Sequence, residues 1–144
     1  MATFVKYEPF IQNLADKIID FFGTGDTFKA VIHTDAPVVA TDATISDLTQ
    51  IGGSNGYTTG GEDIQNDSTR TGGTVTMTAV DITWTASGGN LGASTTGRYV
   101  SIYDDTPTSP ADPLFCSFDY GSTFTVAAGE TFVLDFGASL ATLA

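Results

Sequence analysis

Apolar residues near the N-terminus recur at steps of three and four, the spacing of one face of an α-helix. The members of this stripe are Tyr7, Phe10, Ile11, Leu14, Ile18, Phe21 and Phe22. Pro9 falls in the first turn, where its missing N–H costs little. Gly23 suits the left-handed residue that follows many helices. The pattern predicts an amphipathic helix over about residues 7–22.

From about residue 27 onward, apolar and polar positions alternate, which is the period of β-strands. In the first such segment, Phe28, Ala30 and Ile32 alternate with more polar or smaller neighbours. Further segments of this kind lie at residues 74–86, 99–103, 114–120 and 124–136. Residues 42–51 show no single period and fit either a short helical turn or an edge segment.

Two of these segments carry additional information about strand pairing. Between residues 74 and 86 the apolar positions change from odd to even numbers. A continuous strand cannot change faces without an extra residue, so we expect a bulge or break near residues 79–81. Apolar positions on both sides of residues 127–130 predict a turn that joins two paired strands in a hairpin.

The predicted strands are short and are separated by glycine and proline. The chain has 144 residues, of which 16 are glycine and 41% are hydrophobic. A chain of this length can bury one hydrophobic core without disulfides or metals. We therefore expect one mainly β domain over residues 1–144, a β-sandwich or jelly roll with one N-terminal amphipathic α-helix.

The formal net charge is −12, from 17 acidic and five basic side chains. The basic residues are scattered along the chain at Lys6, Lys17, Lys29, Arg70 and Arg98. Binding to nucleic acid or to an anionic membrane needs clustered positive charge, so we expect neither partner. The sequence also shows no secretory signal and no apolar run of about 18 residues. These features predict a protein made in a cytoplasm.

The chain contains one cysteine, Cys116, and one histidine, His33. These residues permit neither an internal disulfide nor a tetrahedral zinc site, and we expect no cofactor. Asp104, Asp105 and Asp112 lie close together in the sequence but lack EF-hand spacing. We interpret them as solvated turn carboxylates, with a calcium site as the alternative.

One short motif is compatible with a hydrolase. Residues 52–56 (GGSNG) match G-x-S-x-G, with Ser54 in the position of a nucleophile. That motif requires a strand before the serine and a helix after it, whereas residues 57–61 (YTTGG) cannot begin a helix. We therefore interpret the motif as a flexible loop and His33 as a sheet-face or loop-end residue. The competing hypothesis is an enzyme that uses Ser54 and His33.

Several segments, taken together and in order, resemble a family of small virion proteins of tailed bacteriophages. They follow the predicted helix and comprise residues 26–32 (DTFKAVI), 36–37 (AP), 53 (G), 55–58 (NGYT), 60–61 (GG), 81–89 (DITWTASGG), 98–103 (RYVSIY), 113–114 (PL), 119–122 (DYGS) and 129–136 (GETFVLDF). The resemblance spans nearly the whole chain and contains no catalytic motif. It implies a β-sandwich subunit that is attached to the head, or occasionally to the tail, and that oligomerises.

On this basis we expect a capsid decoration (cement) subunit, located in the virion, that binds the major capsid protein and forms homo-oligomers. The alternative is a tail- or fibre-associated carbohydrate-binding β-sandwich module, for which Trp84 and the tyrosines would have to form a platform. More often such residues lie in a core or in an interface. Protein interfaces favour aromatic residues over lysine. We expect Phe4, Val5, Tyr7 and Phe10, or exposed strand edges, to contact the partner.

Overall fold

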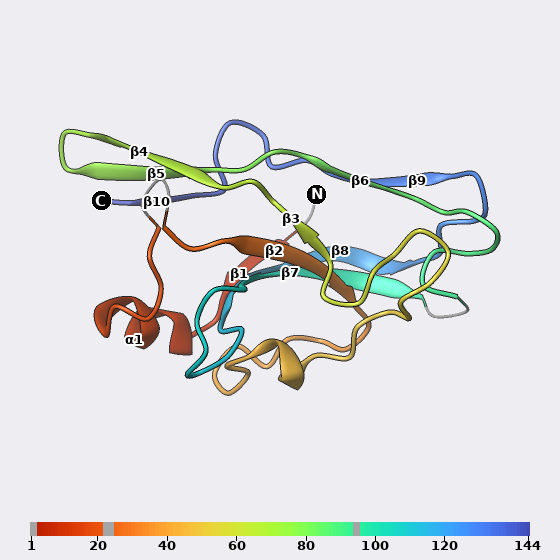
Figure 1. Ribbon diagram of the computed structural model, residues 1–144, viewed down its shortest axis with the longest axis horizontal. Helices are drawn as coiled ribbons and strands as arrows, with labels where there is room; N and C mark the ends of the chain where they lie inside the picture. Colours follow the sequence, from red (N-terminus) through yellow and green to blue (C-terminus); the bar gives the residue numbers. More distant parts are fainter. Residues whose placement is uncertain (1–2, 22–24, 94–95) are drawn as a thin grey trace.

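A computed structural model describes residues 3–21, 25–93 and 96–144 (Figure 1). The strands are β1 (Thr3–Lys6), β2 (Phe28–His33), β3 (Glu62–Asp63), β4 (Asp67–Thr71), β5 (Thr74–Thr78), β6 (Ile82–Thr85), β7 (Gly97–Asp104), β8 (Leu114–Phe124), β9 (Thr131–Leu134) and β10 (Ala141–Leu143). The helical elements are α1 (Pro9–Ala15) and the 3-10 turn η1 (Ile45–Asp47).

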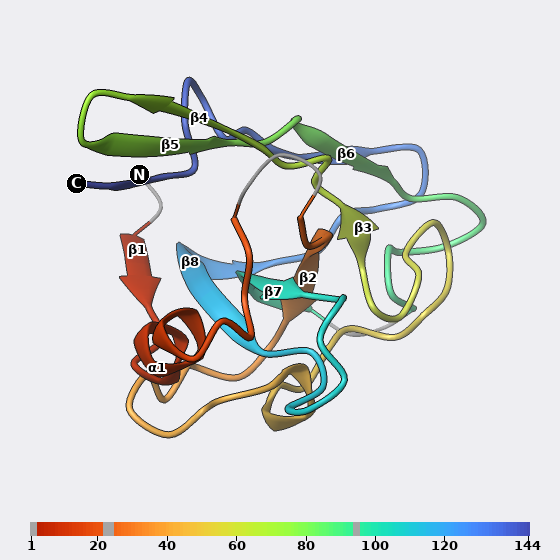
Figure 2. The ribbon, with the colours of Figure 1, turned by 60° about the vertical axis from the view of Figure 1, so that its left-hand side comes forward.

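The strands form two layers. One layer is an antiparallel sheet with the order β1-β8-β7-β2-β3. The other consists of two smaller sheets, β10-β5-β4 and β6-β9, which lie side by side over one face of the first (Figures 1 and 2). Helix α1 and the segment that contains η1 lie on the opposite face. The predicted mainly β fold with one N-terminal helix is confirmed; the jelly roll specifically is not.

The central strands are buried on both faces. Phe28, Ala30 and Ile32 of β2 belong to the main core between the two layers. Val31, on the other face of β2, belongs to a second cluster that includes Tyr7. The sheet therefore has a core on each side, because the segment that contains η1 covers the face that a two-layered fold would leave to solvent.

The helix is shorter than predicted. It ends at Ala15, and Lys17 adopts the left-handed conformation with φ of 60°. The chain then turns so that Ile19 and Phe21 enter the main core. The prediction of a helix over residues 7–22 is therefore wrong in its second half. Packing of Phe21 against Phe10, with ring centroids 5.4 Å apart, replaces the continued helix. Phe22 and the predicted C-cap Gly23 lie outside the described residues.

The two predictions on strand pairing have different outcomes. The break is confirmed, because β5 ends at Thr78 and β6 begins at Ile82 in a different sheet. The hairpin is wrong. The predicted turn does form, with the Glu130 N–H donating to the Ala127 carbonyl at 2.9 Å. However, β8 pairs with β7 and β9 pairs with β6, so this turn connects the two layers.

Candidate functional site

The second half of β8 lies at an open side of the molecule. β8 has eleven residues, and β1 pairs with only four of them, Cys116–Asp119. Beyond Asp119, the described part of the chain provides no strand on that side of β8. The side chain of Tyr120 is consequently 55% exposed. This side of the two-layered fold also carries the half-buried rings of Phe118, Phe124 and Phe132.

Three aromatic side chains from β8 and β9, Tyr120, Phe124 and Phe132, are in mutual contact there. The rings of Phe124 and Phe132 are stacked with centroids 4.4 Å apart and an interplanar angle of 6°. Tyr120 packs edge-on against both rings, at 5.3 and 6.0 Å. Phe118 lies on the same strand and meets Phe4 of β1 edge-on at 5.5 Å. The contacts of Phe132 with Tyr120 and Phe124 pair large apolar surfaces across the two layers without a shared backbone ladder.

Three hollows follow this line of rings between the layers. The first, of about 530 Å³, lies around Phe124, Glu130 and Thr131. The second, of about 480 Å³, lies between Phe118 of β8 and Val133 of β9. The third, of about 110 Å³, lies between Phe118 and Leu140. We call this surface the aromatic groove, defined by the residues Phe4, Val100, Phe118, Tyr120, Phe124, Phe132, Val133 and Leu134.

The groove carries negative charge and no positive charge among the described residues that line its hollows. Its ionisable side chains are Glu130 and Asp135, apart from the phenol of Tyr120. The Glu130 carboxylate accepts the Ala127 N–H at 3.0 Å, and the Asp135 carboxylate accepts the Gly137 N–H at 2.7 Å. Both carboxylates remain exposed. Such a surface is suited to binding an apolar segment with basic neighbours.

The structure divides the predicted interface residues into two groups. Phe4 is 46% exposed and lies at the aromatic groove, and Val5 is half-buried on the other face of β1. Tyr7 and Phe10 are 0% and 2% exposed, so their predicted place at a surface is wrong. The Tyr7 hydroxyl is hydrogen-bonded inside the protein, and the Phe10 ring packs 4.5 Å from that of Phe115.

His33 lies at the end of β2 in a buried chain of hydrogen bonds. Its Nε2 is 2.8 Å from the Ser101 Oγ, and its Nδ1 is 3.4 Å from the Asp35 Oδ1. The Ser101 Oγ is also 2.9 Å from the Tyr7 hydroxyl. Burial lowers the pKa of His33, and a neutral imidazole with its proton on Nδ1 fits these partners.

The hydrogen bonds join a serine, a histidine and an aspartate, Ser101, His33 and Asp35, in the same order as in a catalytic triad. However, Ser101 and His33 are both 0% exposed, so no substrate can reach the hydroxyl. The sequence offered Ser54 as the partner of His33, whereas the folded chain supplies Ser101, 68 positions away. We interpret the set as a structural network that links β2, β7 and Tyr7.

The G-x-S-x-G motif is a loop, as the sequence predicts. The N–H of Tyr57 donates to the Ser54 carbonyl at 3.1 Å, which closes a turn immediately after the serine. No helix follows it before β3. The Ser54 hydroxyl is buried without a hydrogen-bond partner among the described residues, whereas a nucleophile must be exposed and paired with a base.

The carboxylates near β7 do not converge into a metal site. Among the described residues, no group of three or more His, Cys, Asp or Glu side chains could hold a metal ion. Asp105 instead pairs with Lys29 at 2.7 Å. Asp104 is fully buried, so its interpretation as a solvated turn carboxylate is wrong. Burial, and then the neighbouring carboxyl of Asp26, raise its pKa to about 8.

A platform of aromatic residues for carbohydrate is not present as proposed from the sequence. Trp84 is 2% exposed, and four of the five tyrosines are buried, three of them in the two cores. Tyr120 is the exposed tyrosine, and it is part of the aromatic groove. These burial values favour the core interpretation of Trp84 and of those three tyrosines.

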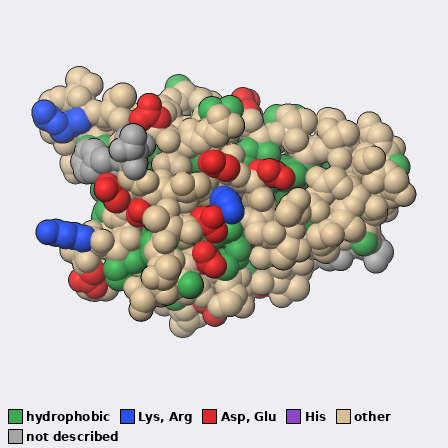
Figure 3. Space-filling view, in the orientation of Figure 1, with side chains coloured by type: hydrophobic (Ala, Val, Ile, Leu, Met, Phe, Trp, Pro, Cys, Tyr) green, Lys and Arg blue, Asp and Glu red, His purple; other side chains and the backbone are tan. Residues whose placement is uncertain are grey.

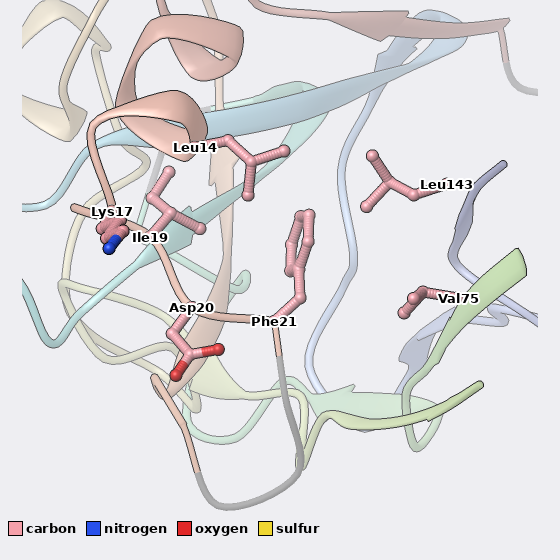
Figure 4. Close-up of a pocket in the computed structure, with 7 residues that line it drawn as sticks. All are labelled: Leu14, Lys17, Ile19, Asp20, Phe21, Val75 and Leu143. Atoms are coloured by element: carbon pink, nitrogen blue, oxygen red, sulfur yellow. The ribbon is translucent and has the colours of Figure 1, made fainter. Parts of the chain in front are cut away.

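A further hollow, of about 470 Å³, separates the end of the α1 segment from β5 and β10 (Figure 4). Leu14, Phe21, Val75 and Leu143 supply apolar walls, and Lys17 also lines it. Residues 22–24, which follow Phe21, lie outside the described residues. We assign no ligand to this hollow.

The face of the molecule in Figure 3 carries scattered carboxylates and isolated basic groups, in keeping with the net charge of −12. None of the helices that the structure describes has the length and apolar character needed to span a membrane. Comparison of the chain with protein-family models, with curated proteins and with solved structures finds no significant match.

Proposed function

We propose that the protein is a virion structural protein of a tailed bacteriophage, a capsid decoration subunit that binds the major capsid protein. The observation that carries the proposal is the aromatic groove, where Phe4, Tyr120 and Val133 are 46%, 55% and 53% exposed. Contiguous exposed apolar side chains on a polar surface are typical of protein contact sites. The ordered resemblance to small virion proteins supports the same assignment.

Decoration requires a rigid subunit and many repeated contacts. The two cores supply rigidity, and the capsid supplies many identical sites, so that each individual contact can be modest. We also propose that copies associate as homo-oligomers on the capsid surface. We propose no catalytic activity, since the serine, histidine and aspartate set is sealed inside the protein.

Mass spectrometry of purified virions tests the proposal directly. We expect the protein in a fixed ratio to the major capsid protein, and its absence from virions would refute the assignment. A second experiment measures binding to particles that lack the protein. The double variant Tyr120→Ser, Val133→Ser should lose binding.

The matched control for that experiment is Val80→Ser. Val80 is 52% exposed, as Val133 is 53% exposed, but it lies between β5 and β6 and lines none of the hollows of the aromatic groove. The control should therefore bind particles as the unmodified protein does. Equal loss in both variants would show that the groove is not the contact.

A further inference from the structure

β9 has an unpaired edge along the aromatic groove. Among the described residues it pairs with β6 alone, with Phe132 opposite Trp84. The Ala86 N–H donates to the Glu130 carbonyl at 2.9 Å. Because an antiparallel ladder alternates, Phe132 and Leu134 also direct their backbone groups toward β6. Thr131 and Val133 therefore direct their N–H and C=O groups to the open side.

The three hollows lie beside this unpaired edge in the order of the chain. Thr131 lines the first hollow, Val133 lines the second, and Asp135 lines the second and third. The second and third hollows have mainly apolar walls that include Phe118, and the rings of Phe124 and Phe132 line the more polar first hollow. Free backbone groups next to hollows with apolar side chains in their walls are the features by which proteins bind an added strand: the backbone provides hydrogen bonds, and the hollows receive alternate side chains.

The charge of the site selects among possible occupants. Glu130 and Asp135 lie at the two ends of β9, and no lysine or arginine lines the hollows in the described part of the chain. A second copy that added its own β9 to this edge would bring two more carboxylates, its Glu130 and Asp135, beside these. Like charges at an interface oppose association, so a basic segment from a different protein fits the site better.

We propose that an extended segment of the partner adds as a strand to β9, places alternate apolar side chains in the hollows, and sets lysine or arginine beside Glu130 and Asp135. The identity of this partner as the major capsid protein rests on the proposed function. The addition of a strand to β9 is independent of the proposed function, because it is inferred from the unpaired edge, the hollows and the charges.

A peptide experiment tests the binding mode without capsids. The probe is a short synthetic peptide that alternates valine and threonine between terminal lysines, and its control carries terminal glutamates. Hydrogen exchange reports on the amides of Thr131, Val133 and Asp135. We expect the lysine peptide to slow exchange at these amides and the glutamate peptide to leave it unchanged.

Variants of the unpaired edge test the same interaction. Val133→Pro removes an outward N–H, a change that edge strands tolerate, and should abolish peptide binding. Val133→Thr keeps the N–H and should retain binding. The pair Glu130→Gln and Asp135→Asn keeps the oxygens that accept the Ala127 and Gly137 N–H groups. Loss of these two charges should weaken the binding of the lysine peptide about tenfold.

The outcomes separate this inference from the proposed function. Equal binding of both peptides, or unimpaired peptide binding by a Val133→Pro protein with a native melting temperature, would overturn strand addition at β9. Failure of the Val133→Pro protein to bind particles would support strand addition as the way in which the protein contacts the capsid. Absence of the unmodified protein from virions would overturn the decoration function alone, because the peptide measurements involve no capsid.

Discussion

The imidazole of His33 and the hydroxyl of Ser101 are joined by a 2.8 Å hydrogen bond between β2 and β7, and neither side chain is exposed. The two residues are far apart in the sequence but lie close together in the sheet. Ser101 pairs with Val31 in the β2–β7 ladder, and His33 is two residues beyond Val31 on the same strand. The same hydroxyl lies 2.9 Å from that of Tyr7. Ser101 is thus the central member of a buried polar network.

Replacing this central residue should destabilise the fold. Ser101→Ala leaves the buried His33 Nε2 without its partner and removes one of the two serine hydroxyls, Ser101 and Ser117, that interact with the Tyr7 hydroxyl. Each unsatisfied group costs about 1–3 kcal/mol, and urea unfolding should show a loss in that range or above it. Ser139→Ala, at an exposed position, should change stability by less than about 0.5 kcal/mol. Equal stability of the two variants would mean that the network contributes nothing.

The buried carboxyl of Asp104 should make stability depend on pH. Its folded pKa of about 8 lies above the ordinary value of 3.8, so the folded protein holds a proton that the unfolded chain releases. Stability from this group is therefore lost progressively as pH rises between these two values. Asp104→Asn mimics the protonated form and should flatten this loss, as measured by urea unfolding across the range.

The control for this experiment is Asp16→Asn at an exposed position. That variant should follow the pH profile of the unmodified protein. A profile of Asp104→Asn that also matches the unmodified protein would contradict a buried protonated carboxyl at Asp104.

Two glycines with positive φ should respond differently to alanine. Gly61 has φ of 72°, and a Cβ there would collide with the backbone carbonyl of Ala30. Gly72 has φ of 60° and no atom within 4 Å of the added Cβ. Gly72→Ala should cost about 1–2 kcal/mol from backbone strain alone. Gly61→Ala should cost at least about 2 kcal/mol more than Gly72→Ala, as measured by thermal unfolding. Equal losses of stability in the two variants would contradict the close approach of Gly61 to the Ala30 carbonyl.

Two phenylalanines should separate stability from binding. Phe115 is 2% exposed and contacts the rings of Phe10, Phe21 and Phe28. Phe115→Ala should cost about 3–5 kcal/mol of unfolding free energy. Phe4 is 46% exposed, so Phe4→Ala should change stability by less than about 1 kcal/mol while it reduces binding to particles. A stable Phe4→Ala protein with full particle binding would remove Phe4 from the contact surface.

Local patterns in the sequence were sufficient for several elements. The alternation of Phe28, Ala30 and Ile32 predicted β2, and the change of parity near residues 79–81 predicted the break between β5 and β6. Both depend only on which side of a strand a residue occupies, and neighbours in the sequence determine that. Ser54 was placed in a loop because the residues that follow it, YTTGG, cannot begin a helix.

Other features depend on contacts between distant segments. The helix ends early because Phe21 packs in the core against Phe10 and Phe115, a contact that the apolar stripe could not reveal. The predicted hairpin failed because the alternation on both sides of residues 127–130 is the same whether two strands pair in one sheet or face each other across layers. Here Phe124 and Phe132 stack across layers.

The chain alone was thus enough to predict a mainly β protein with an N-terminal helix and a loop around Ser54, because period, turn residues and composition are local properties. The partner of His33, the burial of Tyr7 and Phe10, and the unpaired edge of β9 beside an acidic aromatic groove were decided by the tertiary structure. Each of these depends on which distant strands become neighbours, and the free energy that selects those neighbours comes from burying side chains of both segments together.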